Sequence, residues 1–192
     1  MIFVVEICRN KYYRQGGRLM GVLSKADFYY GALLSGLINS GFAPAIIEQA
    51  DNRRLYSITA NTGDYMIYAK YASEPLARKN KEVQLWQFVF VQDEIEIIRQ
   101  FLESNKRYYF ALICGKKEFK GSEIALLSLQ DVQDCLDYNY VRDSYRITIR
   151  SEKGKHGLRA YGTGRADKLN GVDNTIRLSR DILSCFQKEQ VS

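Results

Sequence analysis

Residues 54–91 read RLYSITANTGDYMIYAKYASEPLARKNKEVQLWQFVFV and carry the clearest secondary-structure signals of the chain. Three runs rich in β-branched and aromatic residues, Leu55–Thr59, Tyr65–Tyr71 and Leu85–Val91, predict three strands. Alternation along the middle run places Tyr68 and Lys70 on one face of that strand. A lysine that shares a strand face with a tyrosine, among apolar neighbours, is the first candidate for a functional residue.

The flanking sequence predicts helices on both sides of these strands. Ser24 is a good N-cap for a helix that reaches about Ser40 and stops at Gly41. The apolar residues at helical spacing in this helix are Phe28, Ala32, Leu33, Leu37 and Ile38. Asp93 is expected to cap a second helix from Glu94 to about Ser104. The other expected elements are strands at Ala45–Glu48, Arg107–Cys114 and Glu123–Leu129, and a short helix at Leu129–Leu136.

These elements predict an α/β or α+β protein in which a mixed central β-sheet is flanked by helices. After the short helix, Tyr145–Ser151 and Leu158–Gly162 form a predicted β-hairpin, and Thr175–Leu178 a last strand. The chain is 192 residues long, which suits one domain better than two. We therefore expect a single domain over residues 20–192, with a core at 24–136 and a C-terminal β extension at 142–186.

Residues 1–19 have two interpretations, which the sequence leaves open. The codons for Gln15-Gly16-Gly17 can contain a bacterial ribosome-binding sequence, and Met20 follows at a suitable distance, so this segment can be an untranslated leader. Alternatively, Ile2–Ile7 is a genuine strand. Its apolar run is too short for a membrane span and lacks the features of a secretory signal.

Cysteine and histidine usage argues against a zinc site. The four cysteines, Cys8, Cys114, Cys135 and Cys185, are far apart, and His156 is the only histidine. No CxxC pair is present, so we expect reduced thiols in a cytoplasmic protein.

From Ser24 to about Leu136 the order of elements resembles the PD-(D/E)xK, or restriction-endonuclease-like, nuclease superfamily. In that family a strand that ends in an acid-x-Lys motif precedes a strand with aromatic residues and then a helix. Here Tyr68-Ala69-Lys70 precedes Trp86-Gln87-Phe88 and the helix from Glu94. The resemblance implies a restriction-endonuclease-like core.

The same resemblance implies a Mg²⁺ site in which a lysine activates water. Lys70 would be that lysine, and Glu48 and Asp51 would be the metal-binding and catalytic acids. Tyr68 stands where the family has an acid, and a neutral phenol is a poor Mg²⁺ ligand. The sequence therefore favours a nucleic-acid-binding protein that no longer cleaves. A Mg²⁺-dependent nuclease with a displaced acid is the alternative, and an exposed strand lysine without catalytic function is the simplest interpretation of Lys70.

The formal net charge of +6 favours an anionic partner, DNA or RNA. Much of the excess lies in the predicted C-terminal hairpin. The residues expected to bind nucleic acid are Arg146, Arg150, Lys153, Lys155, Arg159 and Tyr161. Arginine and lysine would contact phosphates while the tyrosine stacks on a base. A solvated hairpin face is the alternative, as is a non-enzymatic protein that binds another protein or a second copy of itself.

Overall fold

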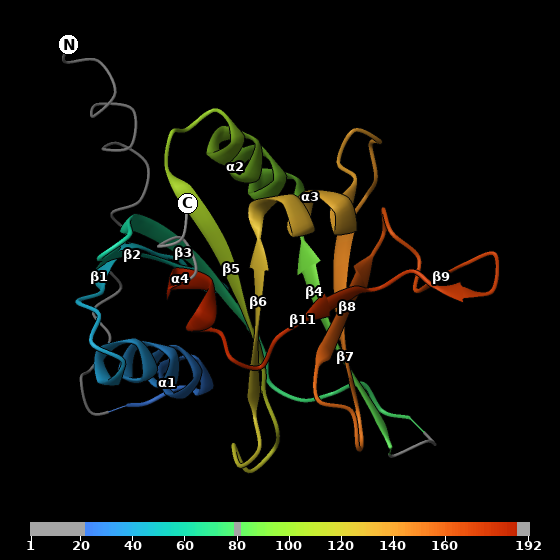
Figure 1. The fold of residues 1–192 in the computed structure, drawn as a ribbon, viewed down its shortest axis with the longest axis horizontal. Helices are drawn as coiled ribbons and strands as arrows, with labels where there is room; N and C mark the ends of the chain where they lie inside the picture. The colour runs from blue at the N-terminus through green and yellow to red at the C-terminus, as the bar shows by residue number, and fades with distance from the viewer. Residues whose placement is uncertain (1–21, 79–81, 188–192) are drawn as a thin grey trace.

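The computed structural model describes residues 22–78 and 82–187, which form two main β-sheets and four helices (Figure 1). The helices are α1 (Lys25–Asn39), α2 (Gln92–Leu102), α3 (Leu129–Leu136) and α4 (Ser184–Gln187). The strands are β1 (Ala45–Gln49), β2 (Arg54–Ala60), β3 (Gly63–Ala72), β4 (Val83–Phe90), β5 (Arg107–Cys114), β6 (Glu123–Ser128), β7 (Tyr145–Glu152), β8 (Leu158–Gly162), β9 (Lys168–Leu169), β10 (Val172–Asp173) and β11 (Ile176–Leu178). The two interpretations of residues 1–19 fall outside the described residues.

Sheet A contains five strands in the order β1-β2-β3-β5-β6, and it is mixed, as the sequence predicts. Only the β3–β5 pair is parallel, because a long crossover returns the chain to the end of the sheet where β3 began. The other three pairs are antiparallel. The protein is therefore a mixed α+β structure whose central sheet is mostly antiparallel.

Sheet B contains four strands in the order β11-β8-β7-β4 and corrects the expectation of a single central sheet. After β3 the chain leaves sheet A, and β4 pairs with β7 along its whole length, from Val83 opposite Glu152 to Phe90 opposite Tyr145. Both edges of β3 are already occupied, by β2 and β5, so β4 has no position beside it. The predicted C-terminal hairpin is thus the middle of a second sheet. A separate two-stranded sheet, β9–β10, was not predicted.

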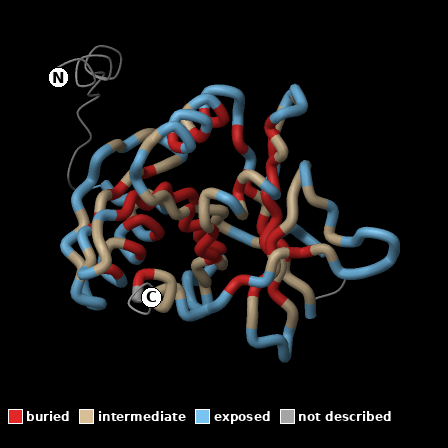
Figure 2. The backbone as a smooth tube through the Cα atoms, turned by 45° about the horizontal axis from the view of Figure 1, so that its top comes forward, coloured by how far each residue is buried: buried red, intermediate tan, exposed pale blue. Residues whose placement is uncertain are grey.

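Two hydrophobic cores cover the two faces of sheet A (Figure 2). One face packs against the inner face of sheet B and against α2 and α3, where Trp86, Phe110 and Ile147 are fully buried. The other face packs against α1 and α4 through residues such as Tyr65 and Leu37. Because β3 lies between these layers, its six central residues, Tyr65–Lys70, are all buried.

α1 begins as predicted, but its buried stripe differs from the predicted one. Ser24 caps the helix, and its side chain and that of Asp27 form a capping box. The stripe that packs on sheet A runs through Tyr29, Tyr30, Leu33 and Leu37, whereas Phe28, Ala32 and Ile38 are exposed. The two large tyrosine rings supply more contact area to the sheet than the residues of the predicted stripe would.

Three of the cysteines lie in the described part of the chain, and Cys114 and Cys135 are free thiols. Cys114 and Cys135 are buried, and Cys185 is half-buried. Among the described residues, no helix combines the length and apolar character needed to cross a bilayer.

Candidate functional site

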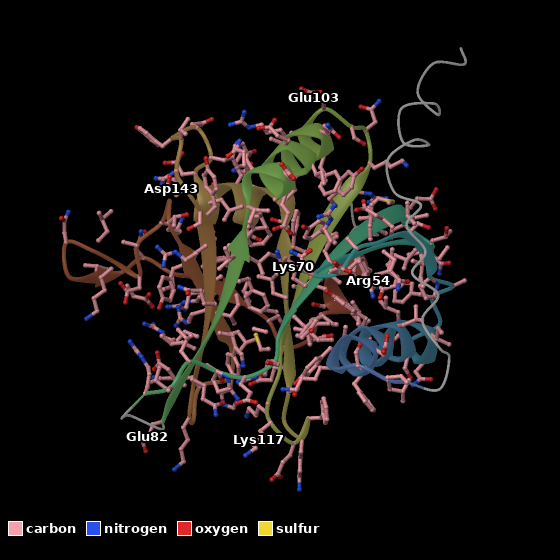
Figure 3. All side chains as sticks on the ribbon, turned by 180° about the vertical axis from the view of Figure 1, so that it is seen from behind. Arg54, Lys70, Glu82, Glu103, Lys117 and Asp143 are labelled. Carbon is pink, nitrogen blue, oxygen red and sulfur yellow. The ribbon has the colours of Figure 1, made fainter. Side chains whose placement is uncertain are left out.

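Lys70 lies in the core between the two sheets, on the same face of β3 as Tyr68 (Figure 3). Its Nζ atom is 2.6 and 2.8 Å from the two carboxylate oxygens of Glu94 and 2.7 Å from the carbonyl oxygen of Val89. Nζ also lies 4.7 Å from the centre of the Phe90 ring. An ammonium group has three N–H donors. The three acceptors therefore use all of them, and the Lys70 side chain is only 7% exposed.

Glu94 is equally saturated, because four donors surround its fully buried carboxylate. Oε1 accepts from Lys70 and from the Tyr68 hydroxyl. Oε2 accepts from Lys70 and, at 3.1 Å, from the backbone N–H of Val91, the N-cap residue of α2. A carboxylate offers about four lone-pair sites, so none remains for another ligand. The first turn of a helix also favours a negative charge.

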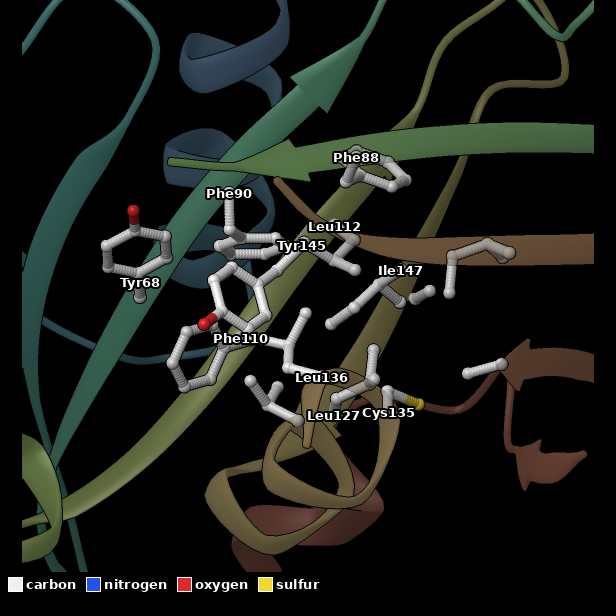
Figure 4. Close-up of a cluster of buried hydrophobic side chains, with 14 of the residues drawn as sticks. Tyr68, Phe88, Phe90, Phe110, Leu112, Leu127, Cys135, Leu136, Tyr145 and Ile147 are labelled. Atoms are coloured by element: carbon white, nitrogen blue, oxygen red, sulfur yellow. The ribbon is translucent and has the colours of Figure 1, made fainter. Parts of the chain in front are cut away.

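Burial sets the protonation of the two groups that face Glu94. Burial lowers the pKa of the Lys70 ammonium, and the adjacent Glu94 carboxylate opposes that shift. Burial, with Glu94 adding to it, raises the pKa of the Tyr68 hydroxyl well above its ordinary value. Tyr68 therefore remains a neutral donor. Its ring lies beside those of Phe90 and Phe110 in the core (Figure 4).

The two acids expected beside Lys70 have other environments. Glu48 accepts hydrogen bonds from Arg53, with its Oε1 atom 2.7 Å from Nη2, and Asp51 is exposed in the turn between β1 and β2. Glu48 is in register with Leu55, and Leu55 with Tyr68. Glu48 therefore stands two strands away from β3, roughly 10 Å.

Glu94, which the sequence did not single out, is the carboxylate that meets Lys70. A signal for it was present: positions 94, 98 and 101 lie on one face of a helix, and Ile98 and Phe101 are buried with Glu94. The sequence instead suggested Asp93 as the cap, which is wrong, since the N-cap is Val91. Within residues 22–78 and 82–187, no three His, Cys, Asp or Glu side chains gather as metal ligands.

The predicted basic residues lie mainly on the outer face of sheet B. Along β7, Ile147 and Ile149 point into the core, so Arg146 and Arg150 point outward. Arg150 is in register with Arg159 on β8, and Arg159 with Arg177 on β11. These three arginines therefore form a row across three neighbouring strands. Paired residues in adjacent strands share a face of the sheet.

Tyr161 lies on the same outer face, opposite Thr148 in the register of β7 and β8. Its ring is half-buried, and burial raises the pKa of its hydroxyl. The structure therefore places Tyr161 one register row away from Arg150 and Arg159. Lys153 is separate from this group, since it lies in the β7–β8 turn, where its Nζ is 3.9 Å from Glu82.

Carboxylates flank part of the arginine row. Arg150 lies 2.9 Å from Glu152, and Asp173 lies 3.1 Å from Arg159 and 4.0 Å from Arg150. No carboxylate of the described residues pairs with Arg146 or with Arg177. A cavity of about 210 Å³ opens between the row and the β9–β10 hairpin. Its lining combines four basic residues, Arg150, Lys155, Arg159 and Lys168, with three acids, Glu152, Asp167 and Asp173.

The glycine-rich segment 162–164 does not present free backbone amides. The N–H groups of Gly162, Thr163 and Gly164 donate to the carbonyl oxygens of Arg165, Arg146 and Cys135, respectively. The segment fastens the end of β8 to the end of α3, and it offers no anion-binding loop.

Comparison of the chain with protein-family models, with curated proteins and with solved structures finds no match to any of them.

Proposed function

We propose that this protein binds nucleic acid through the outer face of sheet B, on a nuclease-like fold that does not cleave. The observation that carries this proposal is the arginine row, Arg150, Arg159 and Arg177, beside Arg146 and Tyr161 on one sheet face. Clustered guanidinium groups neutralise phosphates, and an aromatic ring on the same surface can stack on a base.

The charge balance of this face favours a polyanion over a protein partner. The outward positions of β7, β8 and β11 hold the four arginines and a single acid, Glu152. Arginine suits phosphate recognition because its planar guanidinium donates two parallel hydrogen bonds. The arginines of the row are spaced as adjacent strands are, roughly 5 Å apart. The repeated phosphates of a nucleic acid match such a row better than the isolated carboxylates of a protein partner do.

The arrangement of sheet A supports the resemblance to the PD-(D/E)xK superfamily. α1, β1–β3, α2 and β5 follow one another in that order, and β3, which carries Tyr68-Ala69-Lys70, lies in the middle of a mixed sheet. The departure is β4, whose Trp86-Gln87-Phe88 lies in sheet B. We therefore propose the resemblance for the strands around Lys70 and not for the aromatic strand.

Loss of cleavage follows from the saturation of Lys70 and Glu94. A catalytic lysine must reach water, and a metal ligand must have a free lone pair. All three donors of Lys70 and the four acceptor sites of Glu94 are engaged within the protein. We therefore regard this pair as a structural element of the core.

The experiment compares two triple variants in fluorescence-anisotropy titrations with a labelled oligonucleotide. Arg146→Ala/Arg150→Ala/Arg159→Ala removes three charges from the proposed interface. Lys106→Ala/Lys117→Ala/Lys120→Ala removes three exposed charges elsewhere and is the matched control. Each phosphate contact contributes about 0.9 to the slope of log K against log salt concentration, so the first variant should flatten the slope by about three. The control should retain the wild-type slope.

Three outcomes would contradict the proposal. Equal flattening in both variants would show that net charge alone, without a defined face, drives binding. A folded wild-type protein that does not bind at about 50 mM salt would favour the protein-interaction alternative. Cleavage with Mg²⁺ that disappears in Lys70→Ala would establish the nuclease alternative.

A further inference from the structure

We propose that Arg150 and Arg159 form a phosphate-binding subsite and that the carboxylate of Asp173 occupies it until nucleic acid displaces it. This inference rests on the proposed nucleic-acid binding, and it names the position on the interface where one phosphate is held.

The two arginines converge on a single anion. They are direct register partners on β7 and β8, and Asp173 reaches both from β10, 3.1 Å from Arg159 and 4.0 Å from Arg150. Their side chains are only 19% and 25% exposed, so each has little freedom to point elsewhere. The adjoining cavity of about 210 Å³ has room for an anion larger than a carboxylate.

Thr175, as well as the two arginines, favours the charged form of Asp173. The backbone N–H and the hydroxyl of Thr175 donate to its Oδ1 atom at 3.1 and 2.7 Å. These hydrogen bonds, with the charges of Arg159 and Arg150, keep the pKa of Asp173 below its usual value. A carboxylate in this position offers the arginines two anionic oxygens, as a phosphodiester does.

The hairpin that carries Asp173 is suited to displacement. β9 and β10 contribute two residues each to a sheet of their own, and this hairpin projects from the molecule (Figure 2). Leu169 and Val172 beside its turn are 60% and 68% exposed, so little apolar burial fixes it. A lone two-stranded hairpin is marginally stable in water. Its position therefore depends strongly on contacts at its base, such as that of Asp173.

The test measures affinity for a fluorescein-labelled oligodeoxythymidine of about 20 nucleotides at fixed low salt. Asp173→Asn should lower Kd by roughly tenfold, because the phosphate no longer competes with a carboxylate for two arginines. Glu103→Gln is the matched control: it removes one exposed negative charge at the end of α2, and its effect should be much smaller. Asp173→Glu keeps the charge and should bind as the wild type does.

The gain must also depend on the arginines. Adding Arg150→Ala and Arg159→Ala to Asp173→Asn should abolish it. Asp173→Ser is a second neutral variant, and thermal unfolding of each protein identifies any that has lost its fold. If Asp173→Asn gains no more affinity than Glu103→Gln, or if its gain survives without the two arginines, the subsite is overturned. The proposed function would still be supported by the salt dependence of wild-type binding. Failure of the wild type and of Asp173→Asn alike to bind would overturn both.

Discussion

At the scale of single residues, the decisive feature is the hydrogen-bond saturation of Lys70 and Glu94. A buried charge is tolerated when it is paired and when its remaining donors or acceptors are satisfied. Tyr68, Val89 and Val91 complete this pair with a hydroxyl, a carbonyl and an N–H group. The tyrosine in the acid position of the resembled motif is therefore a donor to a carboxylate from α2.

A double-mutant cycle tests the pair. Lys70→Met and Glu94→Gln should each lower the free energy of unfolding by about 3–5 kcal/mol, because each leaves the opposite charge buried without its partner. The double variant should lose clearly less than the sum of the two. Urea unfolding measures all three proteins, with Lys153→Ala, which removes one partner of an exposed pair, as a control that should be nearly neutral. Additive losses, or single losses under about 1 kcal/mol, would show that the pair is not the buried unit described here.

At the scale of elements, the contact between α3 and the end of β8 depends on glycine. A Cβ atom added at Gly164 would lie 2.2 Å from the Cβ of Asp137 and 2.6 Å from its backbone nitrogen. Asp137 is the C-cap of α3 and has a positive φ of 43°, so it has little freedom to retreat. The helix and the strand can approach this closely only because position 164 has no side chain.

Two glycine-to-alanine variants should therefore have opposite effects. Gly164→Ala should destabilise the protein by about 1–3 kcal/mol through overpacking. Gly36→Ala, at an exposed position in the last turn of α1 with nothing within 4 Å of the added atom, should stabilise it by about 0.5–1 kcal/mol. Chemical unfolding measures both. A neutral Gly164→Ala would mean that α3 moves away from β8 at no cost.

The elements also show what a sequence can predict and what it cannot. β5, α3 and β8 end where periodicity and turn residues predict, because these signals are local. The strand with which β4 pairs was not predictable, since the alternation of its side chains is the same whether it pairs with β3 or with β7. The Lys70 partner was missed for a related reason: Glu94 is a common residue for a first helical turn, and only the tertiary fold buries it.

At the scale of the whole molecule, the two sheets have different surroundings. Sheet A is enclosed between α1 and α4 on one side and sheet B on the other. Sheet B packs its inner face on sheet A and turns its outer face, with Arg146 and the arginine row, away from both cores. Sheet A with its helices thus forms the central layer of the protein, and β7, β8 and β11 supply the basic surface.

Mapping of backbone amide chemical shifts during titration with an oligonucleotide tests this division most directly. The amides of β7 and β8 from Arg146 to Tyr161, together with those of β9–β10, should shift at low salt and return as salt is added. The amides of α1 and β1, on the far side of sheet A, should not move. Shifts concentrated in α1 and β1, or around Lys70, with β7 and β8 unaffected, would contradict the account.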